Sequence, residues 1–185
     1  MTNLQIQQEL STERSFQPPY SNVQPVWHLI LLTVLTFGLY QMVWIYKTWK
    51  QLCKHNNWNI NYVFRTVFTF IPIIGFIIVP SMFKRIKMLL KQKEIELRIY
   101  PVPFMLTFYV LNALFRLPSQ YWLLGFLSII PIAYTQYGLN IYWRKEQMNH
   151  VVISRFTKRQ WILITLGSLL WILTLIGMFG EQEGE

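Results

Sequence analysis

The sequence predicts an all-α, polytopic membrane protein with four transmembrane spans and one re-entrant or kinked hairpin, and five spans are the alternative. Of its 185 residues, 53% are hydrophobic and 14% are charged, whereas soluble domains carry about a quarter of their residues as charges. Several apolar runs are long enough to cross a hydrocarbon core about 30 Å thick. Lys and Arg gather between these runs, which is typical of cytoplasmic loops.

Residues 1–25 are polar and rich in Gln, and prolines at 18, 19 and 25 interrupt any helix there. We expect a disordered tail, followed by a single transmembrane domain over residues 26–180 and a short acidic tail over 181–185. No basic residue followed by an apolar stretch stands near the start, so no secretory signal is expected.

The first apolar run, 26–46, carries no charge before Lys47 and is expected to be one uninterrupted span. A helix of that length is about 30 Å long at 1.5 Å per residue, which suits the hydrocarbon core. Trp27 and His28 are expected to mark one end of the span, because amphipathic rings and long basic side chains belong at the membrane interface. The residues expected to mark the other end are Trp44, Tyr46, Lys47, Trp49 and Lys50.

The second run, 62–80, contains Pro72, Gly75 and Pro80. Proline removes a helical hydrogen-bond donor and glycine loosens the helix, so we expect this run to break and return to the side from which it entered. Broken backbone cannot face lipid. The turn, expected near Ile71–Gly75, should therefore be buried among other helices.

Residues 81–99 are predicted to form a basic amphipathic helix on the membrane surface. One face carries apolar side chains, namely Phe83, Ile86, Leu89, Leu90 and Leu97. The remaining faces are basic, and each basic residue beside an anionic leaflet adds about 1 kcal/mol to binding. The residues predicted to contact anionic lipid headgroups are Lys84, Arg85, Lys87, Lys91 and Lys93.

Three further apolar runs, 101–117, 121–142 and 161–179, are predicted to cross the membrane. Arg116 lies in the turn between the first two of them, and a basic loop at 144–159 separates the last two. If run 62–80 is re-entrant, nearly all Lys and Arg lie on the cytoplasmic side, with Arg14 and Arg116 outside. We therefore prefer this arrangement to five spans.

The stretch Trp27–Leu52 resembles a prokaryotic integral-membrane family that is known only as a domain of unknown function. A Thr-Phe-Gly-x-Tyr motif followed by a Trp-x-Tyr-Lys exit carries the resemblance. Its residues here are Leu31, Leu32, Thr36, Phe37, Gly38, Tyr40, Trp44, Tyr46 and Lys47. The resemblance implies a multi-pass protein of the bacterial cytoplasmic (inner) membrane, and it supplies no activity and no catalytic residues.

Polar residues also occur within the predicted spans. Gly38 and Gln41 share one side of the first span, and Gln136 and Asn140 share one side of the fourth run. Since both sets lie near the basic end of their helix, we expect them to meet. Interhelical hydrogen bonds are the favoured interpretation, and a binding site for a polar substrate is the alternative.

Few residues could support catalysis. All eight acidic residues are Glu and there is one cysteine, so aspartyl nucleophiles and thiolate zinc sites are excluded. No metal and no cofactor is expected. A membrane enzyme would need polar side chains that converge at the cytoplasmic interface, and the candidates are His55, Arg65, Glu146 and His150.

These observations predict a non-enzymatic scaffold, regulator or envelope component whose partner is the bilayer and its anionic headgroups. A protein partner or a homo-oligomer stays open, and nucleic acid is not expected because the topology explains the basic charge. A pore or carrier component for a neutral or polar solute is the first alternative. A lipid-modifying membrane enzyme is the second.

Overall fold

The computed structural model describes residues 22–69, 71–116, 119–147 and 155–180, and all regular structure within these ranges is helical. The predicted tails at 1–21 and 181–185 lie outside them. The elements are α2 (Val26–Leu35), α3 (Tyr40–His55), α4 (Tyr62–Thr69), α5 (Pro72–Gln92), α6 (Pro101–Ala113), the 3₁₀ helices η1 (Leu114–Arg116) and η2 (Ser119–Ser128), α7 (Ile129–Glu146) and α8 (Lys158–Gly180).

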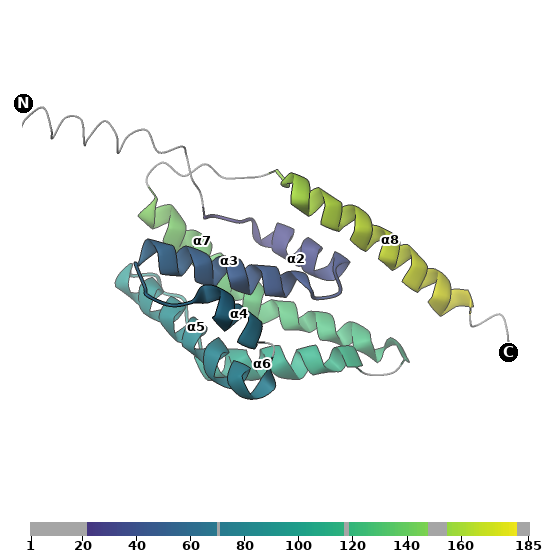
Figure 1. Cartoon of the computed structure of the whole chain (residues 1–185), viewed down its shortest axis with the longest axis horizontal. Helices are drawn as coiled ribbons and strands as arrows, with labels where there is room; N and C mark the ends of the chain where they lie inside the picture. The colour runs from purple at the N-terminus through teal and green to yellow at the C-terminus, as the bar shows by residue number, and fades with distance from the viewer. Residues whose placement is uncertain (1–21, 70, 117–118, 148–154, 181–185) are drawn as a thin grey trace, which may run out of the picture.

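The predicted single span over 26–46 is wrong, because the chain reverses between α2 and α3 (Figure 1). Phe37 and Gly38 have positive φ angles of 50° and 87°. Gly38 N–H bonds to Thr33 C=O at 2.8 Å, and Phe37 N–H bonds to Val34 C=O at 3.2 Å. This pair of bonds is a Schellman motif, which ends a helix and turns the chain. The Thr36 hydroxyl accepts the Tyr40 N–H at 2.9 Å, so the Thr-Phe-Gly-x-Tyr motif forms the turn.

The second run breaks close to the predicted place, since α4 ends at Thr69 and α5 begins at Pro72. The two helices pack against each other as a hairpin. Thr69 is fully buried, and its carbonyl accepts a bond from the Tyr109 hydroxyl at 2.6 Å. Gly75 packs so closely on Tyr109 and on the Thr69 carbonyl that a Cβ atom there would overlap both. Ile71, by contrast, is 43% exposed, so the turn is only partly covered.

The predicted surface helix over 81–99 needs two corrections. It is the second half of α5, and it ends at Gln92, where Glu94 has a positive φ of 53° and closes a second Schellman motif. Its apolar face packs inside the protein, since Phe83, Ile86 and Leu90 are at most 1% exposed. The amphipathic pattern correctly identified the apolar face of this helix. That face packs against α6 and α7, whereas the prediction placed it against lipid.

Helix α6 packs along η2, and the two 3₁₀ helices η1 and η2 also contact each other. Two helices of the described residues are long and apolar enough to cross a membrane, Tyr121–Glu146 and Lys158–Gly177. The predicted count of four or five spans is therefore not supported. One reason is that runs 26–46 and 62–80 are each divided into shorter helices.

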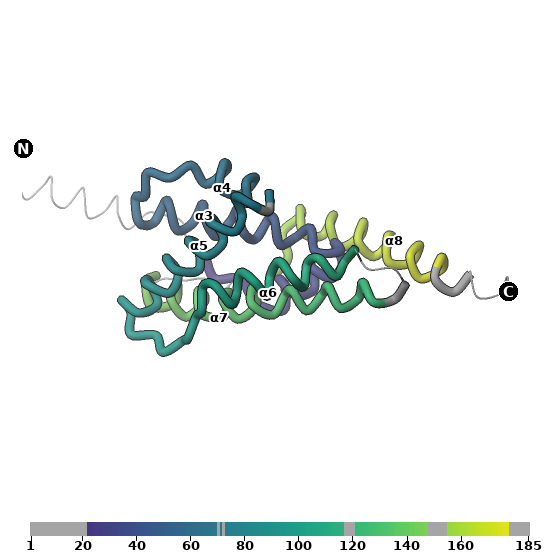
Figure 2. Tube along the Cα trace, turned by 90° about the horizontal axis from the view of Figure 1, so that it is seen from below, coloured from purple at the N-terminus to yellow at the C-terminus, as the bar shows by residue number. Residues whose placement is uncertain are grey.

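The chain forms three hairpins, α2–α3, α4–α5 and α6–η2. Their turns point the same way along the molecule, towards the C-terminal end of α8 (Figures 1 and 2). We call these turns the tips. The C-terminal ends of α3, α5 and α7 lie at the opposite end, which we call the basic end because Lys and Arg gather there. Arg116, in η1, is the one Lys or Arg of the described residues that lies beside a tip.

Several polar side chains are buried while many large apolar side chains are exposed. Gln41, Thr135 and Gln136 are at most 4% exposed, while Ile73 and Ile77 are 81% and 73% exposed. On α8 the outer surface is almost wholly apolar, and only 11% of its candidate span is buried. The core centres on three tryptophans that are at most 1% exposed, Trp44, Trp49 and Trp143.

Candidate functional site

Gln136 and Asn140 lie one turn apart on α7 and form the centre of a buried polar network. Gln136 Nε2 donates to Asn140 Oδ1 at 2.7 Å, and Gln136 Oε1 accepts the Trp44 Nε1–H at 2.6 Å. Asn140 then pairs with the backbone of Gln24, donating to its carbonyl at 2.7 Å and accepting its N–H at 3.1 Å. The Asn140 side-chain amide thus bonds to both backbone groups of Gln24, in the way that the peptide group of a neighbouring strand would.

Gln24 belongs to the segment 22–25, which was expected to be part of the disordered tail. Instead Asn22 and Val23 are 6% and 4% exposed. Asn22 N–H also donates to Gln147 Oε1 at 3.2 Å. The ordered domain therefore begins before α2, because α7 supplies side-chain partners for this backbone.

Gln41 joins a second group of polar residues nearer the tips. Its Nε2 donates to Ser128 Oγ at 2.8 Å, and its Oε1 accepts from Asn112 Nδ2 at 3.3 Å. Gly38 packs against the Phe115 ring in the same region. Gln41 does not bond directly to Gln136 or Asn140; Trp44, one helical turn further along α3, links α3 to that pair. Because these amides satisfy one another, their geometry favours interhelical hydrogen bonding over a substrate path.

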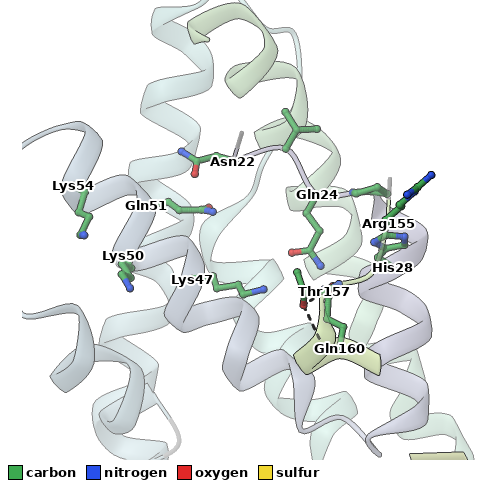
Figure 3. Close-up of a pocket in the computed structure, with 12 residues that line it drawn as sticks. Asn22, Gln24, His28, Lys47, Lys50, Gln51, Lys54, Arg155, Thr157 and Gln160 are labelled. Atoms are coloured by element: carbon green, nitrogen blue, oxygen red, sulfur yellow. Dashed lines mark hydrogen bonds between the residues drawn. The ribbon is translucent and has the colours of Figure 1, made fainter. Parts of the chain in front are cut away.

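A pocket of about 400 Å³ opens at the basic end, above the Gln24 segment (Figure 3). Lys47, Lys50, Gln51 and Lys54 line it from α3, and Lys47 and Gln51 point towards Gln24 and Asn22. Its other lining residues are Val23, Pro25, His28, Arg155, Thr157 and Gln160. Since His28 and Lys47 line one pocket, the prediction that they mark opposite ends of a span is wrong.

The Tyr40 hydroxyl is within hydrogen-bond distance of donors from three residues that line this pocket. Gln24 Nε2 approaches it at 3.1 Å, Gln160 Nε2 at 3.2 Å and Lys47 Nζ at 3.4 Å. Tyr40 is 2% exposed. Its hydroxyl therefore connects α3, α8 and the segment before α2, three parts of the chain that the sequence gives no reason to join.

The pocket has four cationic side chains and no carboxylate among its lining residues. It can attract an anion, since uncompensated positive charges raise the local concentration of anions. His28, which stacks on Phe156 with ring centroids 4.0 Å apart, is the one imidazole that lines it.

The candidate catalytic residues are only partly assembled. His55 Nε2 lies 3.2 Å from Glu146 Oε1, and Lys93 forms an ion pair with the other oxygen of Glu146. Arg65 lies elsewhere, with its guanidinium 4.9 Å from the centroid of the Trp49 ring. His150 lies outside the described residues. No three His, Cys, Asp or Glu side chains of the described chain form a group that could hold a metal ion.

The five residues predicted to contact anionic lipid differ in their surroundings. Lys84 and Lys91 are exposed. Arg85 stacks on Trp58 at 4.5 Å, and Lys87 lies 6.0 Å from the centre of the Tyr100 ring. Lys93 pairs with Glu146. These side chains all lie at or near the basic end, on the second half of α5 and the turn that follows it.

The family comparison covers the two N-terminal hairpins and most of α6. Residues 24–111 match the family described as Domain of unknown function (DUF4234). This confirms the expected domain of unknown function. The DUF4234 match begins at Gln24, the residue held by Asn140, and it includes the Thr36–Gly38 turn. No curated protein and no solved structure matches the chain.

Proposed function

We propose that the chain is an integral membrane protein that acts as a non-enzymatic scaffold or regulator at an anionic membrane face. The exposed apolar surface carries this proposal. Ile73, Ile77 and the outer face of α8 would be exposed to water in a soluble protein, while buried amides occupy the interior. Contiguous apolar surface on this scale suits lipid, where backbone polar groups must be satisfied internally.

We further propose that α6, η2–α7 and α8 cross the bilayer, while α2–α3 and α4–α5 enter and leave on one side. The two candidate spans are η2–α7 and α8. Helix α6 is shorter, but it runs from the basic end towards the tips and packs antiparallel to η2, so it lies mainly beside the tip-side part of that span. Backbone groups at the tips of α2–α3 and α4–α5 find partners inside the protein, as re-entrant backbone requires: the Thr69 carbonyl accepts from the Tyr109 hydroxyl, and the Phe37 and Gly38 N–H groups bond to carbonyls of α2.

The orientation follows from charge. Nearly all described Lys and Arg lie towards the basic end, in the helices that end or begin there and in the segments between them, and such positively charged regions stay in the cytoplasm. With the resemblance to a prokaryotic membrane family, this supports a multi-pass protein of the bacterial cytoplasmic membrane. Lys84, Arg85, Lys87, Lys91 and Lys93 then face the anionic leaflet, where each adds about 1 kcal/mol of attraction.

A topology experiment tests this proposal. Trp27→Cys and Lys54→Cys, at the two ends of the α2–α3 hairpin, are expected to react with a membrane-impermeant maleimide from the same, cytoplasmic side. Arg116→Cys is expected to react from the opposite side. The measurement is labelling of spheroplasts and of inverted vesicles. Labelling of Trp27→Cys and Lys54→Cys from opposite sides contradicts the re-entrant hairpin, and release of the chain by an alkaline carbonate wash contradicts membrane insertion.

The native cysteine should not disturb this labelling. Cys53 is 4% exposed, and burial raises the pKa of its thiol, although Arg65 and Arg85 act in the opposite direction. Because the thiolate is the reactive form, a raised pKa lowers reactivity at neutral pH. We expect wild-type labelling to be slow and to keep rising with pH after an exposed thiol has reached its plateau. Denaturation in dodecyl sulfate should restore ordinary reactivity, and fast labelling of the folded protein at neutral pH would contradict the buried position.

A further inference from the structure

Two arginines of the α4–α5 hairpin line one groove near the basic end. Arg65 comes from α4 and Arg85 from α5, and the groove has a volume of about 520 Å³. Asn59, Asn61 and Ser81 line it as well. None of its lining residues is a carboxylate, so the two positive charges share the groove without a compensating carboxylate. Such a pair costs free energy that a bound anion would relieve.

Both guanidinium groups are held in place by aromatic rings. Arg65 stacks on Trp49 at 4.9 Å and donates from Nη1 to Ser81 Oγ at 2.9 Å. Arg85 stacks on Trp58 at 4.5 Å. A guanidinium has five N–H donors, so Arg65 keeps donors beyond the one bound to Ser81. Stacked, pre-organised arginines are well suited to bind phosphate through paired hydrogen bonds.

The groove continues into apolar surface towards the tip of the hairpin. Ile74 and Ile77 line this part, and Ile77 is 73% exposed. Along α5 the order is Ile74, Ile77, Ser81 and Arg85, so polarity increases from the tip to the basic end. A ligand that fills the groove therefore needs an anionic group at one end and a hydrocarbon chain at the other.

We propose that this groove is a specific binding site for one anionic phospholipid, with the phosphate held by Arg65 and Arg85 and an acyl chain along Ile74 and Ile77. The proposal rests on the membrane location proposed above and deepens it. A headgroup attracted only by surface charge would exchange freely. A headgroup bound by two stacked arginines would be retained when the protein is extracted.

Lipid binding by the purified full-length chain in maltoside micelles tests the site. Fluorescent-chain phosphatidylglycerol is titrated against phosphatidylcholine with the same chains, and inorganic phosphate is a competitor. Wild type should prefer phosphatidylglycerol. The Arg65→Gln/Arg85→Gln variant should lose about tenfold or more in affinity, because two charge-assisted contacts disappear. The control, Arg144→Gln/Arg159→Gln, removes the same charge from the basic end at exposed residues outside the groove.

Several outcomes would overturn the proposed lipid site. Equal losses in the two arginine pairs, or no preference of wild type for phosphatidylglycerol, overturn the groove while leaving membrane insertion to the labelling experiment. Displacement of the lipid by inorganic phosphate at matched concentration would show a phosphate site and overturn the role of the acyl chain. Because Arg65 packs on buried Trp49, Ile77→Glu is a second variant that alters an exposed side chain. It should also weaken lipid binding by repulsion, and unchanged binding overturns the proposal.

Discussion

Replacing Gly167 with alanine is expected to separate α8 from α2 and to lower the free energy of unfolding by about 1–3 kcal/mol, as overpacking does. A Cβ atom at Gly167 would overlap the backbone carbonyl of Leu35, which cannot move aside as a side chain can. One turn further along α8, Trp171 Nε1 donates to Val34 C=O at 2.9 Å. A displaced α8 loses this bond as well, and Val34 C=O loses a partner at the end of α2.

Gly177→Ala is the matched control, since the same change in the same helix meets nothing within 4 Å. Thermal unfolding in detergent measures both variants, and tryptophan fluorescence reports whether Trp171 leaves its stack with Phe37, whose ring centroids are 4.9 Å apart. We expect a lower Tm and changed emission for Gly167→Ala alone. Equal behaviour of the two variants would show that α8 does not pack on α2 in the way described.

Gln136→Leu is expected to destabilise the protein by about 1–3 kcal/mol, because buried donors lose their acceptor. The side chains have similar size, so the effect comes from hydrogen bonding. Trp44, which is 1% exposed, would keep an unpaired Nε1–H, and Asn140 would lose the donor to its Oδ1. Because Asn140 holds the Gln24 backbone, the segment before α2 should also become easier to digest with protease.

The control is Tyr137→Leu, which changes the next residue on α7 at a side chain that is 55% exposed. A double-mutant cycle with Trp44→Phe isolates the indole–amide bond, and the combined loss should be smaller than the sum of the two single losses. Chemical unfolding in mixed micelles gives the free energies. Additive losses would contradict the bond, and a stable Gln136→Leu protein would contradict the structural role of the network.

The turn of α4–α5 could be predicted from the sequence, whereas the turn of α2–α3 could not. Pro72 and Gly75 predicted the break in 62–80, since both residues oppose a continuous helix. The break in 26–46 was missed because its residues are mostly apolar and its glycine is single. Gly38 and the positive φ of Phe37 make a turn there through backbone bonds that hydropathy does not record. A run of apolar residues thus gives a length, but it does not establish that the helix is continuous.

In the candidate site, too, some contacts could be predicted from the sequence and others could not. The spacing of Gln136 and Asn140 predicted a shared helix face, and the two side chains are hydrogen-bonded. Their partners Trp44 and Gln24 lie 92 and 116 residues away along the chain. Tertiary packing alone brings them together, so a single sequence carries no signal for them. The amphipathic face of 81–92 was identified correctly, but its covering layer was not, because amphipathicity does not distinguish a protein neighbour from lipid.

The one-sided arrangement of the hairpins has a consequence for how the chain enters a bilayer. Neither the stretch from Val26 to Tyr46 nor that from Thr66 to Phe83 contains a charged residue. In the proposed orientation, both hairpins can therefore insert into the bilayer from the cytoplasmic side without moving a charged side chain through hydrocarbon. Arg116 is the one described cation that must be moved to the far side. The transfer of Arg116, in η1, is thus an energetically demanding step of biogenesis.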